Sequence, residues 1–162
     1  MGHRANFVVI RDGAAKLFGD SWAALGCIYL LADGPEAAAS AWSDPAFTTD
    51  GLYEWCFAEG GYLIDFDRKT MIAFGYTLPE DEMVNGDGEL DPMIPKLNRA
   101  FEEGKTEFLN AIADQWGGWT LIYDDRGVDR FSSYLDENGI PGIPLIEPSH
   151  PDDVEPPVQL EL

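Results

Sequence analysis

Basic side chains are scarce in this sequence of 162 residues: ten lysines and arginines stand against thirty aspartates and glutamates. The formal net charge of −20 argues against whole classes of partner. Nucleic acid and anionic membranes are held through Lys and Arg, so neither is expected as a ligand. A basic protein or a cation is attracted instead. Because small soluble domains usually carry a net charge of about 2–8 in magnitude, the excess can also serve solubility or salt tolerance alone.

Long apolar runs are missing as well. No segment approaches the roughly 18 apolar residues of a membrane-spanning helix, and the N-terminal residues lack the apolar core of a secretory signal peptide. We therefore expect a cytoplasmic protein. The only two cysteines, Cys27 and Cys56, stand in apolar surroundings. Two buried, reduced thiols are expected rather than a disulfide.

Histidine is nearly absent, which argues against nucleophilic catalysis. The two histidines are His3, beside the start, and His150, inside a proline-rich segment. Neither is expected to be held rigidly against a Ser or Cys, as a catalytic triad or dyad requires. The chain also has no phosphate-binding glycine loop, no Gly-x-Ser-x-Gly and no Cys/His zinc spacing. We expect no cofactor and no metal, and an enzyme is the less favoured class.

What the chain does contain is enough apolar material for a globular domain, since 45% of its residues are hydrophobic and 12% aromatic. Alternating patterns around turn residues predict two antiparallel hairpins, over 7–18 and 62–76. Helical patterns and one further strand follow the same reasoning. The expected helices cover 35–42, 96–116 and 129–135, and the expected strand covers 119–123.

These patterns predict an α+β fold, a small single domain over residues 1–139 in which antiparallel hairpins are packed by two or three helices. From Ile140 the chain becomes dense in proline and has no basic residue. Residues 140–162 are therefore predicted to form an acidic, proline-rich, extended tail. Ile143, Leu145 and Ile146 are its expected anchors.

The segment 85–91 reads NGDGELD and looks like the middle of an EF-hand calcium loop. Met83 and Ile94 would then occupy the first and last ligand positions, and neither supplies the oxygen needed there. Because Asn-Gly and Asp-Gly are ordinary turn formers, the glycines alone explain the pattern. We interpret the segment from Pro79 to Pro95 as an acidic loop that faces a positively charged partner.

Asp65 and Asp67 lie two residues apart in a predicted strand, so their carboxylates are expected on the same side of the hairpin. Paired carboxylates can hold a metal or act as acid and base. Here the alternate positions are apolar, which favours an ordinary solvent-facing position for the pair. Both aspartates are retained as expected partner contacts.

Several motifs together resemble a widespread group of small uncharacterised bacterial proteins. They are the opening RANFVVIRDG, the run WCFAEGGYLIDFDRKT and the run QWGGWTLIYDDRGVDRFSSYL. The resemblance covers residues 3–136, and it departs where the group's Trp-Gly-Ala reads Trp22-Ala23-Ala24. It implies a bacterial or phage origin and a single domain. It assigns no activity, cofactor or site residue.

The sequence favours an acidic protein-binding inhibitor of the immunity, antitoxin or phage counter-defence type, possessing carboxylates where a nucleic acid would present phosphates. Its expected partner is a basic protein, such as a nuclease toxin or a nucleic-acid-binding machine. The expected contacts are Asp65, Asp67, Glu80, Asp81, Glu82, Asp87, Glu89 and Asp91, with Asp152, Asp153 and Glu155 extending the surface.

The alternative is a small-ligand binder or an enzyme that uses aromatic side chains and a carboxylate. Core packing is the simplest role for the five tryptophans, because Trp buries a large area. One or two of them can instead line a recognition surface. The expected pocket is formed by Trp22, Trp55 and Tyr62, with Glu59 or Asp65 as the acid.

Overall fold

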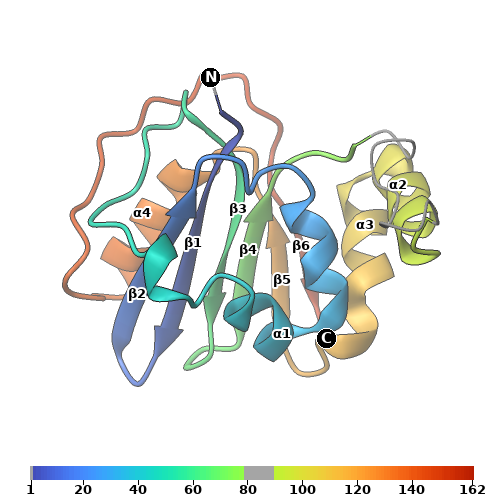
Figure 1. The fold of residues 1–162 in the computed structure, drawn as a ribbon, viewed down its shortest axis with the longest axis horizontal. Coiled ribbons are helices and arrows are strands. Elements are labelled where there is room, and N and C mark those ends of the chain that lie inside the picture. Colours follow the sequence, from blue (N-terminus) through green and yellow to red (C-terminus); the bar gives the residue numbers. More distant parts are fainter. Residues whose placement is uncertain (1, 79–89) are drawn as a thin grey trace.

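The computed structural model describes residues 2–78 and 90–162, and these residues form one six-stranded sheet in the order β2-β1-β3-β4-β5-β6 (Figure 1). The pairs β1–β2, β3–β4 and β5–β6 are antiparallel, whereas β1–β3 and β4–β5 are parallel. The strands are β1 (Arg4–Arg11), β2 (Ala14–Asp20), β3 (Ala58–Asp65), β4 (Thr70–Phe74), β5 (Thr120–Tyr123) and β6 (Val158–Glu161).

The α+β class and the two predicted hairpins are confirmed. The parallel pairing of β1 with β3 joins them, and it depends on a glycine. Gly61 has φ +148°, and a Cβ at this position would lie 1.9 Å from the carbonyl oxygen of Asn6. Any larger residue there would push the two strands apart.

Five short helical segments cover one face of the sheet (Figure 1). Two of them follow the first hairpin in the sequence, and the other three follow the second hairpin. Phe7, Tyr62 and Leu121 point from the strands into this layer, where Leu31 and Phe108 meet them. The segments are η1 (Cys27–Asp33), α1 (Pro35–Ser40), α2 (Met93–Glu103), α3 (Lys105–Ile112) and η4 (Ala113–Gln115). A short turn, η2 (Pro45–Phe47), lies beside β2.

The single long helix predicted over 96–116 is two helices. Gly104 separates α2 from α3 with φ +151°, and its N–H closes the last turn of α2 on the carbonyl of Ala100. Apolar side chains on both sides of the break are nevertheless buried, at Leu97, Phe108 and Ile112. The residues on both sides of Gly104 therefore face the same core, although α2 and α3 are separate helices.

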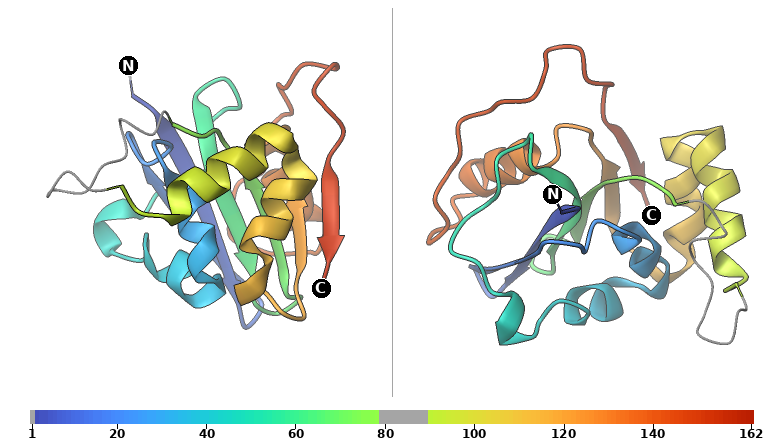
Figure 2. Two further views of the ribbon diagram at one scale, coloured as in Figure 1. Left: turned by 90° about the vertical axis from the view of Figure 1, so that its right-hand side faces the viewer. Right: turned by 45° about the horizontal axis from the view of Figure 1, so that its top comes forward.

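The opposite face of the sheet is covered by α4 (Val128–Glu137), as the right-hand view of Figure 2 shows. Val8, Leu63 and Ile72 point to this side, as expected for residues that alternate with those of the first face. Phe131 and Leu135 of α4 pack on them. Because both faces are covered, the central strands β1, β3 and β4 are almost entirely buried.

Residues 141–157, here called the C-terminal strap, run from the end of α4 over the molecule to β6 (Figure 2). Ile143 and Ile146 pack against the α4 side of the core, whereas Leu145, predicted as a third anchor, is 53% exposed. The strap is extended, as predicted. Its return to the sheet as β6, antiparallel to β5, was not predicted from the sequence.

Neither a membrane span nor a disulfide occurs in the described parts of the chain. None of their helices is both long enough and apolar enough to cross a bilayer. Cys27 and Cys56 are free thiols, as expected. Burial raises the pKa of Cys27 to about 12, but Cys56 is exposed and its predicted burial is wrong.

Candidate functional site

Most of the predicted acidic loop lies outside the described residues. This applies to Glu80, Asp81, Glu82, Asp87 and Glu89. Asp91 is described and exposed, and its Oδ1 accepts a hydrogen bond of 2.9 Å from the N–H of Met93 at the start of α2. Its carboxylate therefore stabilises the turn that leads into α2 while remaining open to solvent.

Asp65 is not a surface residue, so its predicted role as a partner contact is wrong. Its side chain is 0% exposed because β3 is a central strand and the end of α4 covers it. The Tyr134 hydroxyl donates to it at 2.6 Å, and Arg68 Nη1 donates at 3.2 Å. The proximity of this carboxylate also raises the pKa of Tyr134, after the larger effect of burial. Asp65 is a structural acid that ties α4 to the second hairpin.

Asp67 differs from Asp65, and the expected solvent-facing pair does not exist. Asp67 is exposed, and its two carboxylate oxygens accept the backbone N–H groups of Asp12 and Gly13 at 2.8 and 2.7 Å. The bonds from Gly13 and Asp12 lower the pKa of Asp67. Its carboxylate thus pins the turn of the first hairpin to the turn of the second.

The predicted pocket is only partly assembled. Tyr62 is buried against Phe7, and its hydroxyl donates to the carbonyl of Ala38 at 2.7 Å, so its placement in a pocket is wrong. The reason is again the central position of β3, with α1 lying over this face. Trp55 and Glu59, however, do line one cavity.

That cavity has a volume of about 640 Å³ and lies at the upper end of the sheet in Figure 1, where β4 and β5 finish and β3 begins. We call it the acidic cleft. Its aromatic walls are Trp55, Phe74 and Tyr76. The charged groups around it are Glu59, Asp125, Asp153 and Glu155, with Lys105 as the one base among its lining residues.

Asp125 is the most unusual acid of the cleft. It follows β5 directly and is half-buried, and no hydrogen bond or ion pair of its carboxylate occurs within residues 2–78 and 90–162. Burial raises the pKa of Asp125, nearby Lys105 lowers it, and Glu155 and Asp124 raise it further. The backbone carbonyl of Asp125 accepts the indole N–H of Trp55 at 3.2 Å, which fixes this ring to the Asp125 backbone at the cleft.

Lys105, the first residue of α3, interacts with aromatic rings. Its Nζ lies 4.0 Å from the centre of the Phe101 ring and 5.0 Å from the centre of the Tyr123 ring. Both distances are typical of cation–π contacts. The Tyr123 hydroxyl is fixed by Gly75, whose N–H donates to it at 3.0 Å. The cleft thus lies next to a cation that is already held by aromatic faces.

His3 is held at the rim of the cleft, by a carboxylate and a tyrosine hydroxyl. Its carbonyl accepts the N–H of Ala24 at 3.0 Å, and its Nδ1 lies 2.7 Å from Glu59 Oε2 and 3.1 Å from the Tyr76 hydroxyl. Burial, and then the charge of Glu59, raise the pKa of Tyr76 to about 12. The His3 ring also lies 5.8 Å from that of Trp22.

Two large aromatic side chains are exposed beside this rim. Trp22 is 58% exposed and Phe57 is 54% exposed, with the Arg4 guanidinium 5.8 Å from the Phe57 ring centre. Aromatic side chains such as Trp and Phe are enriched at protein interfaces relative to the rest of the surface. Trp22 therefore belongs to the rim of the cleft, and not to a pocket with Tyr62.

Two other acids near this end of the sheet have hydrogen-bond partners within the protein. Asp124 is fully buried and accepts Arg126 Nη2 at 2.7 Å, with Arg130 Nε 3.6 Å away. Asp129, in α4, holds the strap: its Oδ2 accepts the N–H groups of Ser149 and His150 and lies 2.6 Å from His150 Nδ1. His150 is therefore also held, by an aspartate of α4.

Sequence reasoning missed Asp125, Tyr76 and Lys105. For Asp125 a signal existed, because Asp124 and Asp125 follow a predicted strand directly and such positions gather at one edge of a sheet. For Lys105 there was none, since its aromatic partners Phe101 and Tyr123 are brought together only by the fold. Asp153 and Glu155 were expected to extend the acidic surface, and the strap places both at the cleft.

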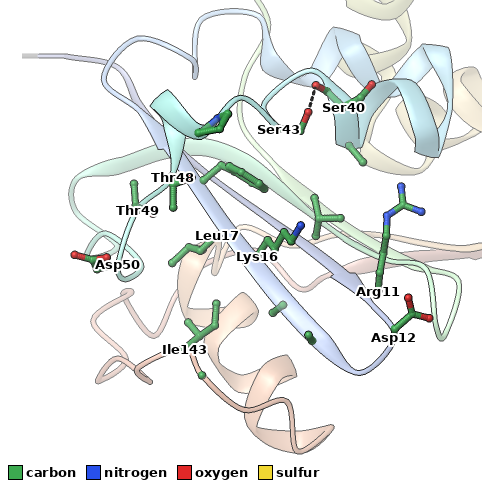
Figure 3. Close-up of a pocket in the computed structure, with 17 residues that line it drawn as sticks. Arg11, Asp12, Lys16, Leu17, Ser40, Ser43, Thr48, Thr49, Asp50 and Ile143 are labelled. Atoms are coloured by element: carbon green, nitrogen blue, oxygen red, sulfur yellow. Dashed lines mark hydrogen bonds between the residues drawn. The ribbon is translucent and has the colours of Figure 1, made fainter.

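A larger hollow of about 910 Å³ runs along β2, at the edge of the sheet (Figure 3). Figure 3 shows its polar groups spread out, with Asp50 at one end and Arg11 and Asp12 at the other. Arg11 is bound to Glu36 at 2.8 Å, and the Ser43 hydroxyl donates to the Ser40 carbonyl at 2.9 Å. Because its polar groups do not converge, we place the candidate site in the smaller acidic cleft.

No family model matches this chain, and no curated protein or solved structure matches it either. The functional conclusions below therefore rest on the geometry and charge of the acidic cleft and its rim.

Proposed function

We propose that this chain is an acidic cytoplasmic protein that binds and inhibits a basic protein partner. The observation that carries the proposal is the acidic cleft, where four carboxylates surround three aromatic rings beside the exposed side chains of Trp22 and Phe57. Aromatic anchors supply binding energy at interfaces, and complementary charge steers association.

The distribution of arginines supports the same partner. Arg68, Arg126 and Arg130 contact buried carboxylates, so their charges neutralise the protein's own acids. Few bases remain to balance the exposed carboxylates of a chain with a net charge of −20. The resulting field attracts a positively charged surface over a distance of about 10 Å at moderate salt.

A nuclease or another nucleic-acid-binding protein fits this chemistry best, because its binding surface is basic and is shaped for regularly spaced phosphates. Carboxylates can occupy these phosphate positions. An immunity protein, an antitoxin or a phage counter-defence protein would act in this way.

The test compares two triple variants that remove equal charge. The cleft variant carries Asp125→Asn, Asp153→Asn and Glu155→Gln, and the control carries Asp33→Asn, Asp114→Asn and Asp136→Asn, all exposed positions away from the cleft. A partner captured from a bacterial extract is purified, and its affinity for each variant is measured by calorimetry at about 0.05 and about 0.5 M NaCl.

We expect a basic partner whose affinity falls with salt, and which binds the cleft variant at least about tenfold more weakly than the control, a difference of about 1.4 kcal/mol. Its nuclease or nucleic-acid-binding activity should be blocked by the wild-type chain. Capture of acidic or neutral proteins only, or equal effects of the two triple variants, contradicts the proposal.

A small-ligand function is the second candidate, and one observation favours it. Asp125 is a half-buried carboxylate with a raised pKa in a cavity, and such groups concentrate at binding and catalytic sites.

A further inference from the structure

The acidic cleft has the size and the walls of a binding site for a small organic group. Its volume of about 640 Å³ lies within the range of roughly 300–1,000 Å³ that is usual for such sites. Trp55 and Tyr76 provide aromatic faces in the same cleft as the Asp125 side chain, and the hydrogen bond from the Trp55 indole N–H to the Asp125 backbone carbonyl fixes one of the two rings. Aromatic faces beside carboxylates form the surroundings that favour ammonium and guanidinium groups.

The negative charge of the cleft is not balanced from within. Of its four acids, Glu59 is paired with His3, whereas the carboxylates of Asp125, Asp153 and Glu155 form no hydrogen bond or ion pair with any other described residue. Burial raises the pKa of Asp125, Lys105 lowers it in part, and Glu155 and Asp124 raise it further.

Lys105 does not remove the imbalance. Its ammonium lies against the rings of Phe101 and Tyr123, and no ion pair joins it to a carboxylate in the described structure. The contact shows that aromatic faces on this side of the molecule already hold one alkylammonium group. It also sets a limit, because the positive charge of Lys105 opposes a second cation that approaches Asp125.

We infer that the acidic cleft binds one alkylammonium or guanidinium group, with Asp125 as its counter-ion and Trp55 and Tyr76 as its aromatic walls. The inference rests on the proposed function, in which the group is a Lys or Arg side chain of the basic partner. A free aliphatic polyamine offers the same chemistry, and the experiment separates the two sources.

Three probes are titrated into the full chain: N-acetyl-arginine amide, the uncharged N-acetyl-citrulline amide, and spermidine. The readout is the NMR signal of the Trp55 indole N–H, which reports directly on the bond to Asp125. The signal is assigned with a Trp55→Phe variant. The variants are Asp125→Asn, Lys105→Met and the control Asp136→Asn, and the NMR spectrum of each shows whether it is folded.

The arginine probe is expected to shift the Trp55 signal, and the citrulline probe is expected to leave it unchanged. Asp125→Asn should weaken binding at least tenfold, or about 1.4 kcal/mol. Lys105→Met should strengthen it by removing a like charge, and Asp136→Asn should have no effect. Tight binding of spermidine with weak binding of the arginine probe identifies a free polyamine as the ligand.

The inference is overturned if the citrulline probe binds as well as the arginine probe, if Asp125→Asn binds normally, or if no cation shifts the signal. In these cases the proposed function still holds if a basic partner binds in a salt-sensitive way and binds the cleft variant more weakly than the control variant. Conversely, cation binding without any basic protein partner leaves the cleft as a small-molecule site and contradicts the proposed function.

Discussion

Two neighbouring aspartates after β5, Asp124 and Asp125, differ in whether the protein supplies a partner for the carboxylate. Asp124 is buried and bound by Arg126, as the buried Asp65 is bound by Arg68 and Tyr134. Asp125 is also removed from water in part, but it has no such partner in the described structure. A carboxylate left in this state costs stability, and this cost is the usual mark of a binding position.

The first prediction concerns the pH dependence of this cost. Burial raises the pKa of Asp125 in the folded protein, so the folded state prefers the protonated acid. This contribution to stability is fully present below the unfolded pKa and is lost as the pH rises through the raised, folded pKa. Asp125→Asn should therefore increase the free energy of unfolding at neutral pH, by about 0.5 kcal/mol or less, and should have no effect in acid. Urea unfolding followed across this pH range measures the difference.

Asp67→Asn provides the opposite sign as a control. The N–H groups of Gly13 and Asp12 lower the pKa of Asp67, so its contribution is present above the unfolded pKa and is lost as the pH falls through the folded one. Asp67→Asn should destabilise the fold at neutral pH, with the effect fading in acid. Parallel pH trends for the two variants would contradict the assigned environments.

At the scale of elements, local patterns predicted what local contacts determine. The hairpin turns, the strand at 119–123 and the helix at 129–135 are all present. The parallel pairings and β6 were missed because their partners are distant in the sequence, and alternation along a strand carries no information about which strand lies beside it. For the same reason the alternating pattern around Asp65 correctly predicted that its side chain points away from that of Ile64. It did not predict that α4 covers the face on which Asp65 lies.

The strap gives a prediction for one element. Asp129 Oδ2 accepts the N–H groups of Ser149 and His150 at 2.8 and 2.9 Å, and the His150 ring as well. Asp129→Ala should lower the free energy of unfolding by about 1.5–3 kcal/mol, because bonds to a buried charged acceptor are lost. Amide hydrogen exchange should accelerate at residues 149–150 and in β6. It should also accelerate in β5, whose amides pair with β6.

His150→Ala is the matched variant, since it removes the ring and keeps both backbone bonds to Asp129. It should have a smaller effect on stability and on exchange in β6. If Asp129→Ala accelerates exchange only within α4 and leaves β6 protected, the strap is held mainly by its apolar contacts through Ile143 and Ile146.

At the scale of the whole molecule, charge was the most informative property of the sequence and the least specific. A net charge of −20 predicts a basic partner, but the residues that gather at the cleft come from β3, β4, α3, the strap and the loops before β3 and after β4 and β5. Trp55 and Glu59 were predicted as site residues and do meet there. The sequence did not show that Tyr62 and Asp65 are buried whereas Trp55 and Glu59 are accessible. Burial depends on which strands and helices lie beside each residue in the packed fold.

The same charge leads to a prediction for stability. Repulsion among the acids opposes the compact state, and salt screens it. Raising NaCl from about 0.02 to about 0.5 M at neutral pH should raise Tm, by about 2–4 °C for each kcal/mol gained. Near pH 4.1, the sequence pI, the effect of salt should vanish because the net charge is close to zero. A Tm that is insensitive to salt at neutral pH would mean that the acids are spaced too widely to repel one another.

The strap also has a consequence for how the molecule is made. Glu59 and Trp55 are translated well before Asp125, and Asp153 and Glu155 follow only after α4. A nascent chain can close its first four strands while the last wall of the cleft and β6 are still inside the ribosome. A translation product that stops before residue 153 would therefore lack the wall of the cleft at 153–155, even with its first four strands paired.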